Sequence, residues 1–173
     1  MEGFYIYYNM KLLSLIKTLI SEAKTLIDTH DVNGQDVNIY YNDHSNLAQN
    51  FSKYGRHPIE EIKNSMVDIL DVIVDVCNEM LDLPSKVVGK DHSILVKDYM
   101  IGVDYHFWVN RNSRGKLFLI INTSIRQSGG KLPYDKNDKK IIITKNGDTI
   151  IKENFNINQF TKIIKGDIII YYN

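Results

Sequence analysis

The chain has very little cysteine and proline: one cysteine, Cys77, and three prolines among 173 residues. A single thiol cannot form an internal disulfide, so nothing in the composition requires an oxidising compartment, and a small buried hydrophobe is the expected role of Cys77. Ten glycines and three prolines are too few for a linker-rich or fibrous chain. Hydrophobic residues make up 43% and charged residues 24% of the chain, which indicates a globular protein. We therefore expect a single domain spanning residues 1–173.

Long uninterrupted apolar runs are also missing. The N-terminal stretch lacks a basic start, and Lys11 and Lys17 interrupt its apolar residues, so it fits neither a signal peptide nor a membrane span. We expect a cytoplasmic protein without membrane association, located in the host cytoplasm if it is phage-encoded. Met1 and Met10 are both candidate translation starts, because the stretch MKLLSLIKTLI begins at Met10.

The motifs that define common enzyme classes are absent from the sequence. There is no phosphate-binding glycine loop, no dinucleotide fingerprint, no paired CxxC and no HExxH motif. The five histidines are scattered without the spacing of metal ligands. We predict neither a metal site nor a cofactor.

What is present is a change in hydrophobic period along the chain. Apolar positions recur at helical spacing over residues 10–29 and 58–82. From about residue 92 the period becomes two, which predicts strands over 93–97, 103–109, 116–125, 140–145, 149–152 and 167–172. Helices followed by strands predict an α+β fold. In this fold a helical part, residues 10–83, packs on a C-terminal antiparallel β-sheet, residues 92–173.

Shorter elements are expected around two Asn-Gly pairs. The stretch 31–36, which contains the pair at 33–34, predicts a turn, and residues 37–41 alternate briefly as a short strand. A capping sequence then predicts a short helix over 44–53. The pair at 146–147 is the strongest hairpin signal in the chain.

Charge is unevenly distributed, although the formal net charge is zero. Residues 57–82 hold seven acids and one lysine, a net charge of −6. Residues 111–145 hold nine bases and two acids, a net charge of +7. Two interpretations are open. The segments are solvated faces that attract one another, or the basic segment is a rim for a polyanion and the acidic helix is turned away from it.

The order of elements around the first histidines is the most informative pattern. The sequence YYNDHSNL at 40–47 brings a short strand to His44 at a helix start, and RHPIEEI at 56–62 opens the second helix before the sheet. Over roughly residues 37–151 this order resembles small toxin-like and phage-encoded endoribonucleases of the RelE/RegB kind. The resemblance implies a sheet that cradles RNA. Ala48 stands where that group usually has an arginine, four residues after the histidine.

Metal-independent RNA cleavage needs a base for the 2′-hydroxyl, an acid for the leaving oxygen and a cation for the phosphorane. Histidine suits the proton transfers near neutral pH, and the planar fork of arginine suits the phosphate. The candidate catalytic residues are His44, His57, His106 and Arg126. His44 and His57 stand near helix N-termini, which attract anions and favour a base over an acid. Each imidazole also fits a capping or surface role.

Candidate substrate-binding residues lie on the predicted strands and in the loop that follows them. Alternation places His106 and Trp108 on one strand face, where the indole could stack on a base or pack against the helices. Arg126 ends an apolar strand beside a polar, glycine-bearing loop. In that loop Lys131 is a candidate phosphate contact and Tyr134 a candidate stacking residue.

Two functions from different classes are therefore carried forward. One is a metal-independent endoribonuclease that acts on RNA through histidine acid–base chemistry and Arg/Lys phosphate stabilisation. The alternative is a non-catalytic phage or plasmid accessory protein, such as a virion component or an inhibitor of a host protein. The apolar tail at 168–172 favours the alternative, because an edge strand there would pair with a protein partner. Nucleic-acid binding without cleavage shares the basic segment and is a third possibility.

Overall fold

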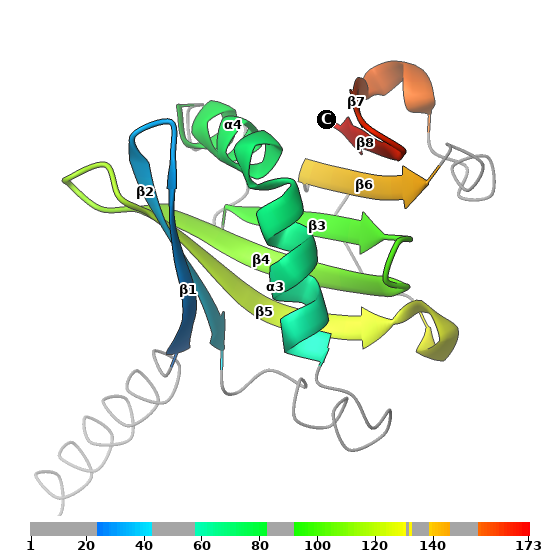
Figure 1. The fold of residues 1–173 in the computed structure, drawn as a ribbon, viewed down its shortest axis with the longest axis horizontal. Coiled ribbons are helices and arrows are strands. Elements are labelled where there is room, and N and C mark those ends of the chain that lie inside the picture. Colours follow the sequence, from blue (N-terminus) through cyan, green and yellow to red (C-terminus); the bar gives the residue numbers. More distant parts are fainter. Residues whose placement is uncertain (1–23, 43–57, 83–91, 131, 133–138, 146–155) are drawn as a thin grey trace, which may run out of the picture.

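The computed structural model describes residues 24–42, 58–82, 92–130, 132, 139–145 and 156–173. These residues form one eight-stranded sheet, with two helices lying across one of its faces (Figure 1). The helices are α3 (Pro58–Asp68) and α4 (Leu70–Asp82). The strands are β1 (Lys24–Val32), β2 (Gln35–Asn42), β3 (Ser93–Asp98), β4 (Val103–Arg111), β5 (Leu117–Arg126), β6 (Lys139–Lys145), β7 (Thr161–Lys165) and β8 (Ile168–Tyr172).

The sheet is mixed, with the strand order β1-β2-β5-β4-β3-β6-β8-β7. The pairs β2–β5 and β3–β6 are parallel, and the other neighbouring strands are antiparallel. The antiparallel unit β3-β4-β5 lies in the centre, the β1–β2 hairpin is added beside β5, and the strand β6 followed by the β7–β8 hairpin is added beside β3. The helices connect β2 to β3 in the sequence and run over the central strands (Figure 1).

The predicted arrangement of N-terminal helices on a C-terminal antiparallel sheet is wrong. Residues 24–29, predicted as the end of a helix over 10–29, lie in β1, and the sheet contains two parallel pairs. The short strand predicted over 37–41 is confirmed as part of β2. The error has a physical source in β1. A β-bulge at Ile27, between Leu26 and Asp28, breaks the period of two and leaves adjacent apolar residues that imitate helical spacing.

The turn predicted over 31–36 is confirmed, but it is confined to residues 33 and 34. Val32 pairs with Gln35, so that Asn33 and Gly34 alone connect β1 to β2. Both residues have positive φ, 54° and 83°, as the two central positions of a type I′ hairpin require. The carboxylate of Asp31 accepts a hydrogen bond from the Gly34 N–H at 3.1 Å.

The predicted helix over 58–82 is confirmed, but it is interrupted at Ile69. The Ile69 N–H bonds to the Met66 carbonyl at 3.3 Å, one residue closer than in an α-helix, and α4 then starts in a new direction (Figure 1). Pro58 begins α3, where its missing N–H costs nothing.

The core lies between the helices and the sheet. Cys77 is fully buried in this core, as expected, and its burial raises the pKa of the thiol. The helices contribute one wall, and alternate residues of the central strands contribute the other. Core residues with no exposed surface include Ile62, Met66, Ile73, Met80, Val37, Ile39, Tyr105, Phe107, Leu119 and Ile121. No helix in the described ranges is long and apolar enough to span a membrane.

The predicted strands over 93–97, 103–109, 116–125, 140–145 and 167–172 correspond to β3, β4, β5, β6 and β8. The strand β7 was not predicted, and it overturns the idea of an edge strand at 168–172. β8 pairs with β6 on one side and β7 on the other, so β7 is the outer strand. Three expected features, the strand over 149–152, the hairpin at 146–147 and the helix over 44–53, fall on residues that the structure does not describe.

Candidate functional site

The sheet face opposite α3 and α4, called the distal face below, carries two of the candidate residues. Along β4, Tyr105 and Phe107 point into the core, so His106 and Trp108 belong to the distal face. Directly paired residues share a face, and Trp108 pairs with Ile120 of β5. Ile120 in turn pairs with Tyr40 of β2. The structure thus places an aromatic, an aliphatic and a second aromatic side chain in one row across three strands.

An aromatic patch on the distal face consists of Tyr40, Phe118 and Trp108, with Lys24 beside it. The rings of Tyr40 and Phe118 lie 5.8 Å apart at an angle of 34°. The Lys24 ammonium lies 5.1 Å from the centroid of the Tyr40 ring and 5.6 Å from that of Phe118. All three aromatic side chains are partly exposed, and Asn110, which pairs with Phe118, is exposed. A sheet face with accessible rings and a cation is chemically suited to stack planar, anionic molecules.

His106 lies on the same face, two residues before Trp108 on the same strand. Its Nδ1 is 3.2 Å from the Ser93 hydroxyl, and the side chain is partly exposed. Thr123 and Leu95 are its neighbours in register on β5 and β3. The imidazole is therefore placed to reach a ligand that stacks on the aromatic patch.

Arg126 does not meet His106, because it lies on the helix side of the sheet. It pairs in register with Val103, three residues before His106 on β4, and side chains three apart on a strand point to opposite faces. Its guanidinium binds both carboxylate oxygens of Glu61 on α3, at 2.8 and 2.9 Å, and reaches the Ile101 carbonyl at 3.4 Å. Arg126 and His106 therefore cannot act on one phosphate.

The other sequence candidates, His44, His57, Lys131 and Tyr134, belong to segments that the structure does not describe. The sequence candidates that lie in the described ranges are His106, Trp108 and Arg126. The first two come together, and the third is separated from them by the thickness of the sheet.

Two arginines of the basic segment, residues 111–145, contact the acidic helices. Besides Arg126, Arg111 of β4 contacts Asn78 of α4 and lies 4.0 Å from the Asp82 carboxylate. Lys165 of β7, which lies outside the basic segment, binds Asp71 of α4. Desolvation opposes ionisation of Asp71, but the hydrogen bonds that it accepts outweigh this effect and lower its pKa. The arginines Arg111 and Arg126 are thus engaged within the fold.

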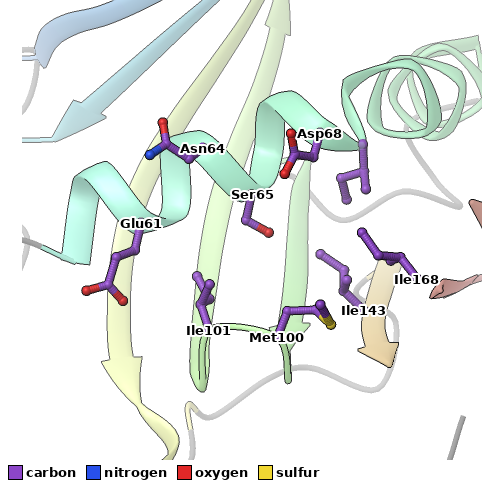
Figure 2. A pocket seen from close by; sticks show the side chains of 9 residues that line it. Glu61, Asn64, Ser65, Asp68, Met100, Ile101, Ile143 and Ile168 are labelled. Carbon is purple, nitrogen blue, oxygen red and sulfur yellow. The ribbon is translucent and has the colours of Figure 1, made fainter. Parts of the chain in front are cut away.

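A pocket of about 350 Å³ opens on the helix side, beneath α3 (Figure 2). Its polar side chains come from α3, and its apolar side chains come from the α3–α4 junction, the β3–β4 turn, β6 and β8. The lining residues are Glu61, Asn64, Ser65, Asp68, Ile69, Met100, Ile101, Ile143 and Ile168. None of these residues was a candidate from the sequence, because they are contributed by four separate segments.

Asp98 stands behind this pocket at the end of β3. Its carboxylate accepts a hydrogen bond from the Ser65 hydroxyl and from the backbone N–H groups of Met100 at 2.9 Å and Ile101 at 3.3 Å. The side chain is fully buried, and desolvation raises the pKa of the carboxyl above its usual value despite these bonds. In the sequence, Asp98 is marked as a possible turn residue only by its position directly before a turn that contains Gly102.

A buried ion pair lies on the distal face, on the other side of the same strands. Lys97 and Asp104 are 3.4 Å apart, and their side chains are 4% and 1% exposed. The Gln127 amide donates to the second oxygen of Asp104 at 2.9 Å. Gln127 begins the short 3₁₀ turn Gln127–Gly129 that follows β5, so its hydrogen bond connects this turn to β4.

Within the described ranges, no group of three or more His, Cys, Asp or Glu side chains could hold a metal ion. Comparison of the chain with protein-family models, with curated proteins and with solved structures finds no match. Any function must therefore be inferred from the residues of this chain. The resemblance to RelE/RegB-like endoribonucleases stays a prediction.

Proposed function

We propose that the chain binds single-stranded RNA over the distal face of its sheet. The aromatic patch carries this proposal, because Tyr40, Phe118 and Trp108 are partly exposed on three adjacent strands. Stacking of a base on an aromatic side chain contributes about 1–3 kcal/mol and tolerates any base. Exposed aromatics on an antiparallel or mixed sheet are a recurrent means of holding splayed bases.

The spacing of the patch suits a nucleic acid strand. β5 lies between β2 and β4, so Tyr40 and Trp108 are separated by two strand spacings, or roughly 10 Å. Two bases of one strand can therefore stack on different rings. The Lys24 ammonium lies beside the Tyr40 ring. A second cation, the exposed Arg114, belongs to the turn between β4 and β5. These cations supply charge for phosphates without requiring a basic protein overall.

A second candidate function, metal-independent cleavage of the bound RNA, is favoured by the position of His106. The imidazole shares the distal face with Trp108, and histidine can transfer a proton near neutral pH. Arg126 cannot serve as the phosphate ligand in this reaction, because it faces α3 and binds Glu61. Lys24, beside the Tyr40 and Phe118 rings, is the cation that we propose for the phosphate instead.

Binding is tested by fluorescence anisotropy with a labelled, unstructured RNA of about 12 nucleotides, a length comparable to known single-strand sites. Trp108→Leu and Tyr40→Leu should each weaken binding by roughly 5- to 150-fold, the equivalent of one lost stacking contact. Tyr172→Leu is the matched control, because Tyr172 is a partly exposed aromatic packed on the helix-side core. Circular dichroism establishes that each variant is folded. Equal affinity of wild type and both distal variants would contradict the proposal.

Cleavage is tested separately by incubating the same RNA with the protein in EDTA. Product from the wild type and none from His106→Ala, at equal RNA affinity, supports the second candidate. Intact RNA with the wild type removes cleavage and leaves binding as the function.

A further inference from the structure

The pocket beneath α3 has an acidic rim and an apolar floor. Among its nine lining residues are two acids and neither a lysine nor an arginine. Figure 2 shows Glu61, Ser65 and Asp68 along the α3 wall, with Met100, Ile101, Ile143 and Ile168 below them. A volume of about 350 Å³ falls at the lower end of the range for small-molecule sites, about 300–1,000 Å³.

The negative charge of the rim is only partly balanced within the fold. Glu61 is bound by Arg126, whereas Asp68 forms no ion pair with any residue in the described ranges. The pocket therefore combines an apolar surface with a field that favours a cation.

We propose that this pocket binds an aliphatic primary ammonium ion, supplied by a free alkylamine or by a lysine side chain of another protein. The alkyl chain packs on Ile101, Ile143 and Ile168, where it is removed from water. The ammonium group carries three donors, and the side chains of Asp68, Asn64 and Ser65 offer oxygen acceptors at the rim. The Asp68 carboxylate disfavours an anion at the same position.

Titration of the ¹⁵N-labelled full chain with pentylammonium, followed by NMR, tests the site. Shifts should concentrate on amides of α3, the β3–β4 turn and β8, with a Kd on the order of 1 mM, as expected for a ligand of about six non-hydrogen atoms. Methylammonium should bind more than tenfold more weakly, because about four buried methylene groups are missing. Pentanol, which keeps the chain and lacks the charge, should also bind more weakly.

Asp68→Asn should weaken pentylammonium binding by about fivefold, which corresponds to the loss of one exposed charge contact. The matched control is Asp75→Asn, which removes an exposed acid of α4 that does not line the pocket. Equal affinity of Asp68→Asn and wild type, or equal binding of pentanol and pentylammonium, would overturn the proposal.

Two peptide probes distinguish a free alkylamine from a lysine side chain of another protein as the source of the ammonium group. A short glycine peptide with one central lysine is compared with the same peptide carrying norleucine. Tighter binding of the lysine peptide than of pentylammonium assigns the site to a partner protein, and weaker binding assigns it to a free amine. RNA binding on the distal face is measured on the same variants, and Asp68→Asn should leave it unchanged, so the two proposals fail independently.

Discussion

The Arg126 guanidinium at the end of β5 binds the Glu61 carboxylate of α3 through two hydrogen bonds of 2.8 and 2.9 Å. The two side chains are 17% and 23% exposed, so the pair is partly shielded from water. This ion pair holds α3 against the sheet at the edge of the pocket beneath α3. It also engages the arginine on the helix side, away from the distal face. A residue that the sequence offered as a phosphate ligand is therefore a structural contact.

A double-mutant cycle measures the strength of this pair. Glu61→Gln and Arg126→Met should show a coupling energy of about 1–2 kcal/mol, above that of an exposed pair, because the fork geometry is bidentate and partly buried. Urea unfolding of the wild type, both single variants and the double variant supplies the four free energies. A coupling energy near zero would mean that the pair is fully solvated.

The β1–β2 turn gives a second prediction. Gly34 has a φ of 83°, and a Cβ added there would meet no atom within 4 Å, so the cost of Gly34→Ala is confined to the backbone. The substitution should lower the free energy of unfolding by about 1–2 kcal/mol. Gly115→Ala, at a φ of 80° in the β4–β5 turn, has the same open space and should behave alike. Thermal or urea unfolding gives both values, and an unchanged stability of Gly34→Ala would argue against the type I′ turn.

The sequence predicted elements well where one face of an element is buried and the pattern is regular. The stripe of α3 and α4 and the alternation of β4 were both visible, because each places its apolar residues at a fixed period. The Asn33-Gly34 turn was visible because only a few residue types accept two successive positive φ angles. His106 and Trp108 were assigned to one face by the same alternation.

The remaining errors came from features that a local pattern does not encode. The bulge at Ile27 shifts the phase of β1, so its strand looked helical. The parallel pairing of β2 with β5 joins segments about 80 residues apart, and no short motif reports that contact. The pairing of Arg126 with Glu61 and the assembly of the α3 pocket depend on the same long-range packing.

Asp98 makes folding stability depend on pH. Desolvation raises the pKa of this carboxyl in the folded chain, so the folded state binds more protons than the unfolded state. The contribution of Asp98 to the free energy of unfolding therefore falls as the pH rises from the ordinary aspartate pKa of about 4 through the raised pKa. Asp98→Asn removes this effect and keeps an oxygen acceptor for the Met100 and Ile101 N–H groups.

The stability of Asp98→Asn relative to the wild type should consequently increase between about pH 4 and pH 7. Urea unfolding at several pH values measures the difference. Asp75→Asn, which removes an exposed charge from α4, is the control. A difference that shrinks as the pH rises would show that the hydrogen bonds of Asp98, and not its burial, dominate.

Removing one partner of the buried Lys97–Asp104 pair should destabilise the fold strongly, whereas replacing both with apolar residues should destabilise it little. Lys97→Met leaves the Asp104 carboxylate 1% exposed without its cation, which should cost about 3–5 kcal/mol. The double variant Lys97→Met, Asp104→Leu removes both charges and should recover most of that loss. Urea unfolding compares the two, and a double variant no more stable than Lys97→Met would show that the Gln127–Asp104 bond matters more than the charge.

Salt dependence gives the sharpest measurement for the distal face. For single strands, the slope of log K against log salt concentration changes by about 0.7 for each phosphate that a cation neutralises. Lys24 lies over the Tyr40 and Phe118 rings, beside any backbone whose bases stack there. Lys24→Gln should therefore lower the slope by about 0.7 and weaken RNA binding most strongly at low salt. Lys165→Gln removes a cation that binds Asp71 on the helix side, so it should leave the slope unchanged. If both variants keep the wild-type slope, the phosphates do not pass Lys24, and the strand must cross the sheet elsewhere.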